Sequence, residues 1–285
     1  MRATRLLSFA RVFLMTVCAV LPAIPAALAA QQTDCEAGAS PLNKAELAGT
    51  TPQQIIQKFS ANESAFKQAW LGYVFDLDIS VATLEGQTTT GEFRQVSTIH
   101  WERGEKKETI NFAPQSTLRE ISLSKQDFDD IYRPPFELTQ ENLPQYKVTY
   151  VGQQRVDEVD AYVFEAEPRQ MEKGKRYFKG RVWVDKVDMV IIKTCGKGVP
   201  DPEPTAKEKK KAKKKGAVQE NITPTAVTYR EFIGGKYWFP TYVRSDEVVH
   251  FATSDIRIRE ILKYKGYRPY APEGAAVAPP SPAKK

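Results

Sequence analysis

The chain has 285 residues, of which 41% are hydrophobic and 27% are charged, and its formal net charge is +6. The segment 207–215 holds seven lysines and one glutamate, so it accounts for the whole positive excess by itself. Nucleic-acid-binding domains instead spread lysine and arginine over a folded face with aromatic residues between them, so the composition argues against a nucleic-acid partner.

The amino terminus has the pattern of a secretory signal peptide over residues 1–29. Arg2 and Arg5 precede an apolar segment, 12–21, and the small residues Ala27 and Ala29 stand where a signal peptidase cuts. The apolar part is too short to span a bilayer. We therefore expect an exported protein that is soluble after cleavage. The rest of the chain is long enough for one large β domain or two small domains.

Cysteine usage agrees with export. Cys18 leaves with the signal peptide, so the mature chain keeps Cys35 and Cys195, an even number in an oxidising compartment. These two residues are predicted to form a structural disulfide. Free thiols are the alternative, although the close C-x-x-C spacing of a reactive thiol pair is missing.

A helix is predicted directly after residues 30–50, which carry no periodic pattern and are predicted to form a flexible arm. Thr51 is typical of an N-cap, with Pro52 at the first helical position and Gln54 completing a capping box. Apolar residues then repeat at helical spacing and predict one buried face: Ile55, Phe59, Phe66 and Trp70.

Strand patterns fill most of the remaining chain. Over 71–82, apolar and polar residues alternate, which predicts a long strand. Residues 177–195 predict a hairpin, because an alternating segment is followed by a polar turn and a β-branched run. Further strands are predicted over 91–103, 107–113, 118–123, 146–156, 161–167, 225–232, 237–250 and 254–264. The order predicts a mainly β fold built on an antiparallel meander.

A second, short helix is predicted after the strand at 118–123. Ser124 and Asp127 form another cap, and two prolines stop the helix. The residues on one side of it are Phe128, Ile131 and Tyr132. We expect this helix to act as a flap.

The mature chain is predicted to form one domain, 51–267, because no linker separates two cores. A lysine-rich loop, 197–224, interrupts this domain. The tail, 268–285, is rich in Pro, Ala and Lys and is predicted to be disordered.

The hairpin sequence G-x-x-W-V-D, followed by an apolar return strand that ends in lysine, resembles the LolA/LolB-like superfamily of bacterial outer-membrane lipoprotein-sorting proteins. The matching segments are 180–185, 191–193, 160–164 and 237–240, and the resemblance covers residues 50–265. It implies a periplasmic protein with a strongly curved antiparallel sheet, an unclosed β-barrel, wrapped around helices. It also implies an apolar cavity that holds acyl chains of lipids or lipoproteins.

The resemblance implies ligand-lining residues on the early strands and on the flap. Compact carriers of this type use an arginine on an early strand to hold the lid helix closed, and Arg94 stands at a similar place. The alternative for the lining residues is ordinary core packing on the first helix. The candidates are Tyr73, Phe75, Leu77, Ile79, Phe93, Ile99, Trp101, Ile110, Phe112, Phe128 and Ile131.

The lysine-rich loop has two interpretations. It is either a solvated loop or a contact for an anionic surface such as phospholipid, lipid A or an acidic partner. The lysines available for such a contact are Lys209, Lys210, Lys211, Lys213, Lys214 and Lys215.

Catalytic patterns are missing from the sequence. His100 and His250 are far apart and lack metal-ligand spacing, and solvated acids are the expected role of Asp76 and Asp78. We therefore expect no cofactor and no enzymatic activity. The leading hypothesis is a periplasmic carrier or binding protein for an acylated ligand, either a lipid or an acylated lipoprotein, in outer-membrane biogenesis. The alternative is an envelope-stress sensor that binds a protein partner.

Overall fold

The computed structural model describes residues 33–133, 135–201, 210, 223–250 and 255–271. The predicted signal peptide, most of the lysine-rich loop and residues 272–285 of the tail lie outside the described residues, whereas the first two tail residues belong to the last strand. No helix within the described ranges is long and apolar enough to cross a membrane.

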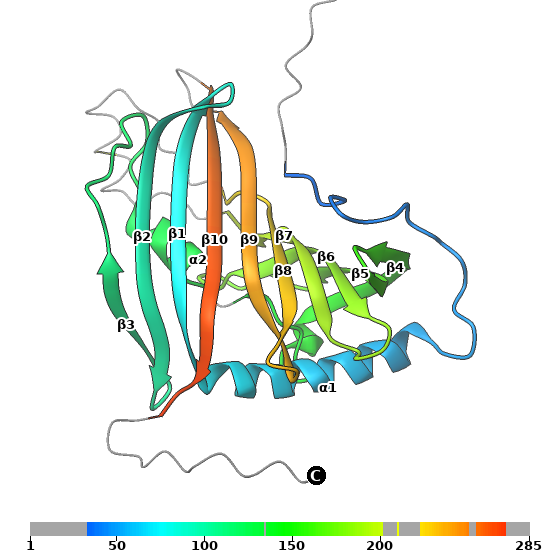
Figure 1. Ribbon diagram of the computed structural model, residues 1–285. Coiled ribbons are helices and arrows are strands. Elements are labelled where there is room, and N and C mark those ends of the chain that lie inside the picture. The colour runs from blue at the N-terminus through cyan, green and yellow to red at the C-terminus, as the bar shows by residue number, and fades with distance from the viewer. Residues whose placement is uncertain (1–32, 134, 202–209, 211–222, 251–254, 272–285) are drawn as a thin grey trace, which may run out of the picture.

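Ten strands form one sheet, and every neighbouring pair is antiparallel. The order across the sheet is β3-β2-β1-β10-β9-β8-β7-β6-β5-β4, so it ends at β3 and β4 and does not close. The sheet curves strongly, and the first helix lies along the ends of its strands (Figure 1). The predicted fold, a mainly β, unclosed antiparallel sheet with two helices, is confirmed.

The described elements follow one another in a meander with helices inserted at two places. The helices are α1 (Pro52–Leu71), α2 (Lys125–Ile131) and the 3-10 turn η1 (Leu143–Gln145). The strands are β1 (Tyr73–Glu85), β2 (Thr88–Glu102), β3 (Glu105–Phe112), β4 (Tyr146–Val156), β5 (Val159–Pro168), β6 (Tyr177–Asp185), β7 (Ile191–Val199), β8 (Ala226–Ile233), β9 (Tyr237–His250) and β10 (Asp255–Pro269).

The predicted start of α1 is confirmed in detail. The Thr51 hydroxyl accepts from the Gln54 backbone N–H, and the Gln54 side chain accepts from the Thr51 N–H, which completes the capping box. The four predicted apolar residues are buried. Glu63 is buried on the same helix, among these apolar positions. The sequence pattern did not predict that a charged residue would occupy the centre of this face.

The hairpin of β6 and β7 is confirmed, and its close approach explains two glycines. Gly180 and Gly196 face each other in register, and a Cβ on Gly180 would lie 2.2 Å from the Cys195 carbonyl oxygen. The return strand runs on to Val199, beyond its predicted end at Cys195. At this position the two backbones are so close that neither residue could carry a side chain.

The strand predicted over 118–123 is wrong. The structure has no strand there; the chain instead meets β2 at a single point, where the Thr117 N–H donates to the Glu92 carbonyl at 2.9 Å. Gly91 allows this crossing, because a Cβ at that position would lie 2.8 Å from the Thr117 carbonyl oxygen. The segment forms no ladder with either edge strand of the sheet, so the apolar pattern alone does not make it a strand.

Two apolar clusters lie on the side of the sheet that α1 covers. Ile55 and Phe59 belong to a cluster with residues of β4 to β7, whereas Phe66 and Trp70 belong to a cluster with residues of β1, β2, β9 and β10. Glu63 lies between these two parts of the helix. We call the side that α1 covers the concave face and the other side the convex face.

The amino-terminal arm, predicted to be flexible, makes specific contacts over residues 33–43. Cys35 and Cys195 form the predicted disulfide. Ala39 and Asn43 form isolated bridges with Val156 and Gln153 of the edge strand β4. A third apolar cluster, on the convex face of β5 to β8, packs against this arm. The arm up to Asn43 is therefore part of the fold.

Candidate functional site

Aromatic side chains from α1, β1, β2, β9 and β10 pack together on the concave face. Trp70 lies 4.6 Å from Trp101 and 5.3 Å from Phe75 between ring centroids, and Phe75 lies 5.4 Å from Tyr264. We call the group the aromatic cluster; its members are Trp70, Tyr73, Phe75, Trp101, Tyr237, Phe239, Tyr264 and Tyr267. Such rings bury large apolar areas and pack at these distances in edge and offset arrangements.

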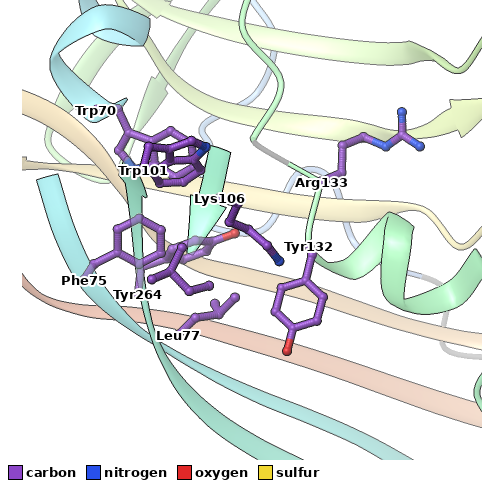
Figure 2. Close-up of a pocket in the computed structure, with 9 residues that line it drawn as sticks. Trp70, Phe75, Leu77, Trp101, Lys106, Tyr132, Arg133 and Tyr264 are labelled. Atoms are coloured by element: carbon purple, nitrogen blue, oxygen red, sulfur yellow. The ribbon is translucent and has the colours of Figure 1, made fainter. Parts of the chain in front are cut away.

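A small pocket opens at the aromatic cluster. Trp70, Phe75 and Trp101 form its wall, with Lys106 and Tyr132 at its side (Figure 2). Its internal volume is about 10 Å³, which is roughly the space that one water molecule needs. An acyl chain does not fit into this pocket, so the aromatic side chains around it pack as a filled core in this structure.

Helix α2 is a short element that packs on this face. Its cap is the predicted one, since the Ser124 and Asp127 side chains each accept from the other residue's backbone N–H. Ile131 is its one buried residue, and Phe128 stacks edge-on against Phe93 at 5.4 Å. Because seven residues bury so little apolar surface, hydrophobic packing holds α2 much less firmly than it holds α1.

A polar latch fixes the carboxyl end of α2 to the sheet. The Tyr132 hydroxyl donates to Glu108 of β3 at 2.7 Å, and Gln95 of β2 donates to the same carboxylate at 3.0 Å. The Lys106 ammonium lies 3.7 Å from the centroid of the Tyr132 ring. Burial, reinforced by the Glu108 carboxylate, raises the pKa of the Tyr132 hydroxyl, which therefore stays protonated and able to donate. The flap is thus held by contacts that can be exchanged for water.

The predicted ligand-lining residues divide into two groups. Nine of them lie in or against the concave core: Tyr73, Phe75, Leu77, Ile79, Phe93, Ile99, Trp101, Phe128 and Ile131. Ile110 and Phe112 do not, because their side chains are 57% and 50% exposed on the edge strand β3. Phe112 pairs with Val96 and lies under the Arg94 guanidinium at 5.8 Å, which places it on the convex face.

Arg94 does not reach the flap. Its guanidinium pairs with Asp78 through two bonds of 3.2 Å on the convex face, so the role that the resemblance implies for it is not fulfilled in this structure. The contacts that hold α2 come instead from Gln95, Lys106 and Glu108. Their spacing gave no signal in the sequence, because the latch joins two strands to a helix more than twenty residues away.

Two other residues considered in the sequence have ordinary structural partners. His100 stacks on Tyr270 at 4.5 Å, and Asp76 accepts from Thr98 at 2.7 Å. No group of three or more metal-ligating side chains occurs within the described ranges. Of the six candidate lysines, Lys210 is described and exposed, and the other five lie outside the described residues.

Glu260 of β10 is predicted to make stability depend on pH. Burial, together with the charges of Asp127 and Asp130 on α2, raises the pKa of its carboxyl to about 7. Because the folded pKa exceeds the unfolded value, this residue's contribution is favourable below the unfolded pKa and is lost as pH rises through 7. We expect Glu260→Gln to remove that loss, so that the variant gains stability relative to wild type between pH 5 and 8 in urea titrations. An unchanged difference across this range would contradict the prediction.

The sequence matches no protein-family model and no curated protein. Solved structures similar to this chain include a LolA superfamily protein from Nitrosomonas europaea, with 11% identity, a TM-score of 0.35, and coverage of 78% of this chain and 95% of that one. A DUF1329 family protein from Desulfovibrio piger has 13% identity, a TM-score of 0.38, and coverage of 77% and 94%. MucB in complex with MucA has 10% identity, a TM-score of 0.22, and coverage of 78% and 100%.

Proposed function

We propose that the protein is a non-enzymatic periplasmic carrier or binding protein for an acylated ligand, either a lipid or the acyl chains of a lipoprotein, in outer-membrane biogenesis. The ligand site is the aromatic cluster on the concave face, reached when α2 moves away. The observation that carries this proposal is the contrast between the two helices: α1 is anchored by six buried residues, whereas α2 buries one.

An apolar face under a weakly packed cover suits a ligand with a long hydrocarbon chain. Each methylene transferred from water to the aromatic cluster contributes about 0.8 kcal/mol. A ligand that binds only the open state then shifts the flap equilibrium by its differential affinity. The closed state keeps the aromatic face out of water between loading events, because exposed apolar patches of this kind promote association.

Loosening the latch is expected to increase ligand uptake. Tyr132→Phe keeps the ring against Lys106 but removes the hydroxyl that donates to Glu108. A hydrogen bond to a charged group is worth about 1.5–3 kcal/mol, so the open fraction rises by roughly tenfold or more. Native mass spectrometry after incubation with palmitate, or with phosphatidylglycerol vesicles, should show a stoichiometric adduct at a lower ligand concentration than for wild type.

Tyr229→Phe is the matched control, because it removes a hydroxyl that contacts the arm, 3.3 Å from the Ala37 carbonyl oxygen, far from the flap. It should leave uptake unchanged. If neither wild type nor Tyr132→Phe forms an adduct, the carrier proposal fails. A ligand-free protein that instead captures one membrane protein supports the alternative, a sensor of the envelope-stress type.

The lysine-rich segment fits a carrier that loads at a membrane. Each lysine close to an anionic surface contributes about 1 kcal/mol, and this attraction weakens with salt. Vesicles with and without phosphatidylglycerol, each at low and high ionic strength, separate this contribution from binding of the acyl chain. Loading that is insensitive to both variables would rule out the lysines as a membrane contact.

A further inference from the structure

Arg176, at the start of β6, touches three parts of the chain that are far apart in sequence. Its guanidinium donates to the Asp130 carboxylate of α2 at 3.0 Å and to the Pro200 carbonyl oxygen at 2.6 Å. It also donates to the Thr223 hydroxyl. Pro200 directly follows β7, and Thr223 precedes β8, so these two residues are the stems of the connection between the two strands.

The Arg176 side chain is enclosed by the surrounding chain, with space for its guanidinium at a glycine. The guanidinium crosses Gly198, where a Cβ would lie 2.7 Å from Arg176 Nη2. The side chain is 11% exposed. Its Nε is buried and has no hydrogen-bond partner among the described residues. A buried guanidinium with one donor already unpartnered is sensitive to the loss of another acceptor, because each unmet donor adds a desolvation cost.

The two stems are also tied to each other. Asp201 pairs with Lys197 at 3.2 Å and accepts from the Thr223 backbone N–H at 3.4 Å. A change at one stem therefore reaches the other stem and Arg176. On the flap side, Asp130 has a second cation, Arg133, at 2.7 Å within the same helix region. Asp130 can therefore release Arg176 without becoming an unpaired buried charge.

We propose that Arg176 is a positioning residue that couples the flap helix α2 to the stems of the β7–β8 connection. The Arg176 guanidinium bonds to Asp130 of α2 and to both stems at the same time. Separation of the stems therefore draws Arg176 away from Asp130, which favours the open position of α2. The inference rests on the proposed function for its biological meaning, because it lets the end of β7 and the start of β8 influence the carrier site. The coupling itself requires no ligand.

Hydrogen exchange of the full oxidised chain without ligand tests the coupling. Thr223→Val removes the stem hydroxyl while keeping the side-chain shape. We expect exchange in residues 124–133 to become faster by on the order of fivefold, although Thr223 does not touch α2. Asp130→Asn should in turn speed exchange in 196–201 and 223–227. Coupling between sites is reciprocal, so both directions are required.

Two controls separate coupling from local loosening. Lys125→Gln removes an ion pair with Asp129 within α2, and Lys179→Gln removes an ion pair with Glu167 beside the β7 stem. Neither pair includes Arg176, Asp130 or Asp201. Neither substitution should change exchange at the opposite element, and residues 256–264 of β10 should exchange at the wild-type rate in every variant. Unchanged exchange of 124–133 in Thr223→Val would overturn the proposal, even if the chain binds palmitate. A chain that shows the coupling but binds no palmitate would overturn the carrier function alone.

Discussion

Arg230→Met is expected to lower the free energy of unfolding by about 3–5 kcal/mol, among the largest effects of any single substitution in this chain. Arg230 of β8 holds the Glu63 carboxylate through two bonds of 2.9 and 3.0 Å, and the two side chains are 1% and 0% exposed. Methionine fills much of the same volume but supplies no charge. The Glu63 carboxylate would then be buried with only the Ile191 N–H, at 3.1 Å, as a described partner.

The loss should depend on pH. Burial raises the pKa of Glu63, and the Arg230 guanidinium opposes that rise. Without the guanidinium, the carboxyl can escape the cost of a buried charge by taking up a proton. Urea denaturation should therefore show a smaller penalty for Arg230→Met at pH 5 than at pH 8, because the folded variant binds a proton that the unfolded chain releases.

A double variant distinguishes a buried charge pair from simple packing. Glu63→Leu combined with Arg230→Met replaces both partners with apolar side chains, which is often close to neutral for stability. We expect the double variant to be more stable than Arg230→Met alone. Lys147→Met is the surface control, because Lys147 pairs with Glu167 at 3.1 Å in solvent and should cost less than about 1 kcal/mol. A cost of that size for Arg230→Met as well would contradict the prediction.

The buried pair also explains which part of the molecule is rigid. Glu63 and Arg230 join α1 to β7 and β8, and Arg230 additionally donates to the Phe136 carbonyl at 2.8 Å and lies over the Phe66 ring at 4.0 Å. These contacts bind α1 to the sheet between the two concave clusters. Helix α2 is held instead by the less deeply buried Arg176–Asp130 pair and by the Tyr132 hydrogen bond to Glu108. If one element moves to admit a ligand, the energetics favour α2 over α1.

Local patterns predicted most of the fold because they reflect short-range rules. Alternation, caps and turn residues fixed the hairpin of β6 and β7 and the start of both helices. The sequence did not reveal Glu63 as a core residue, since a glutamate within an apolar helical face looks like an interruption until Arg230 is placed opposite it. The role of Arg176, and the hydrogen bond of Tyr132, which was predicted only as a residue on one side of α2, were missed for the same reason. Their roles depend on partners 24 to 47 residues away, which no spacing rule connects.

The arm is the clearest case in which a lack of periodicity was misleading. Residues 33–43 lack periodicity because they pair through backbone bridges and one disulfide rather than through an apolar face. They cover Lys193 of β7, whose ammonium donates to the Ala37 carbonyl at 2.7 Å. That ammonium lies 4.8 Å from the Trp183 ring and 5.2 Å from the Tyr229 ring. Burial lowers the pKa of Lys193. Removal of the arm would expose this ammonium to water.

Replacing both cysteines of the disulfide by serine is expected to lower the free energy of unfolding by about 2–5 kcal/mol. The Cys35–Cys195 bond links residues 160 apart in sequence, and a cross-link over so long a segment removes much chain entropy from the unfolded state. Urea denaturation of the oxidised wild type and of the Cys35→Ser/Cys195→Ser variant, at the same pH, measures the difference. Wild type treated with a reductant should match the variant.

The same variant tests how the arm is held. If the disulfide is the main anchor, its removal should expose Lys193, and labelling of this lysine by an amine-reactive reagent should accelerate towards the rate of the exposed Lys147. The backbone bridges at Ala39 and Asn43 are the competing anchors, each pairing with the edge of β4. If Lys193 is labelled slowly in the variant although stability falls as expected, these bridges hold the arm over Lys193. The disulfide would then act on the unfolded chain alone, because a cross-link can stabilise a fold without holding any surface closed.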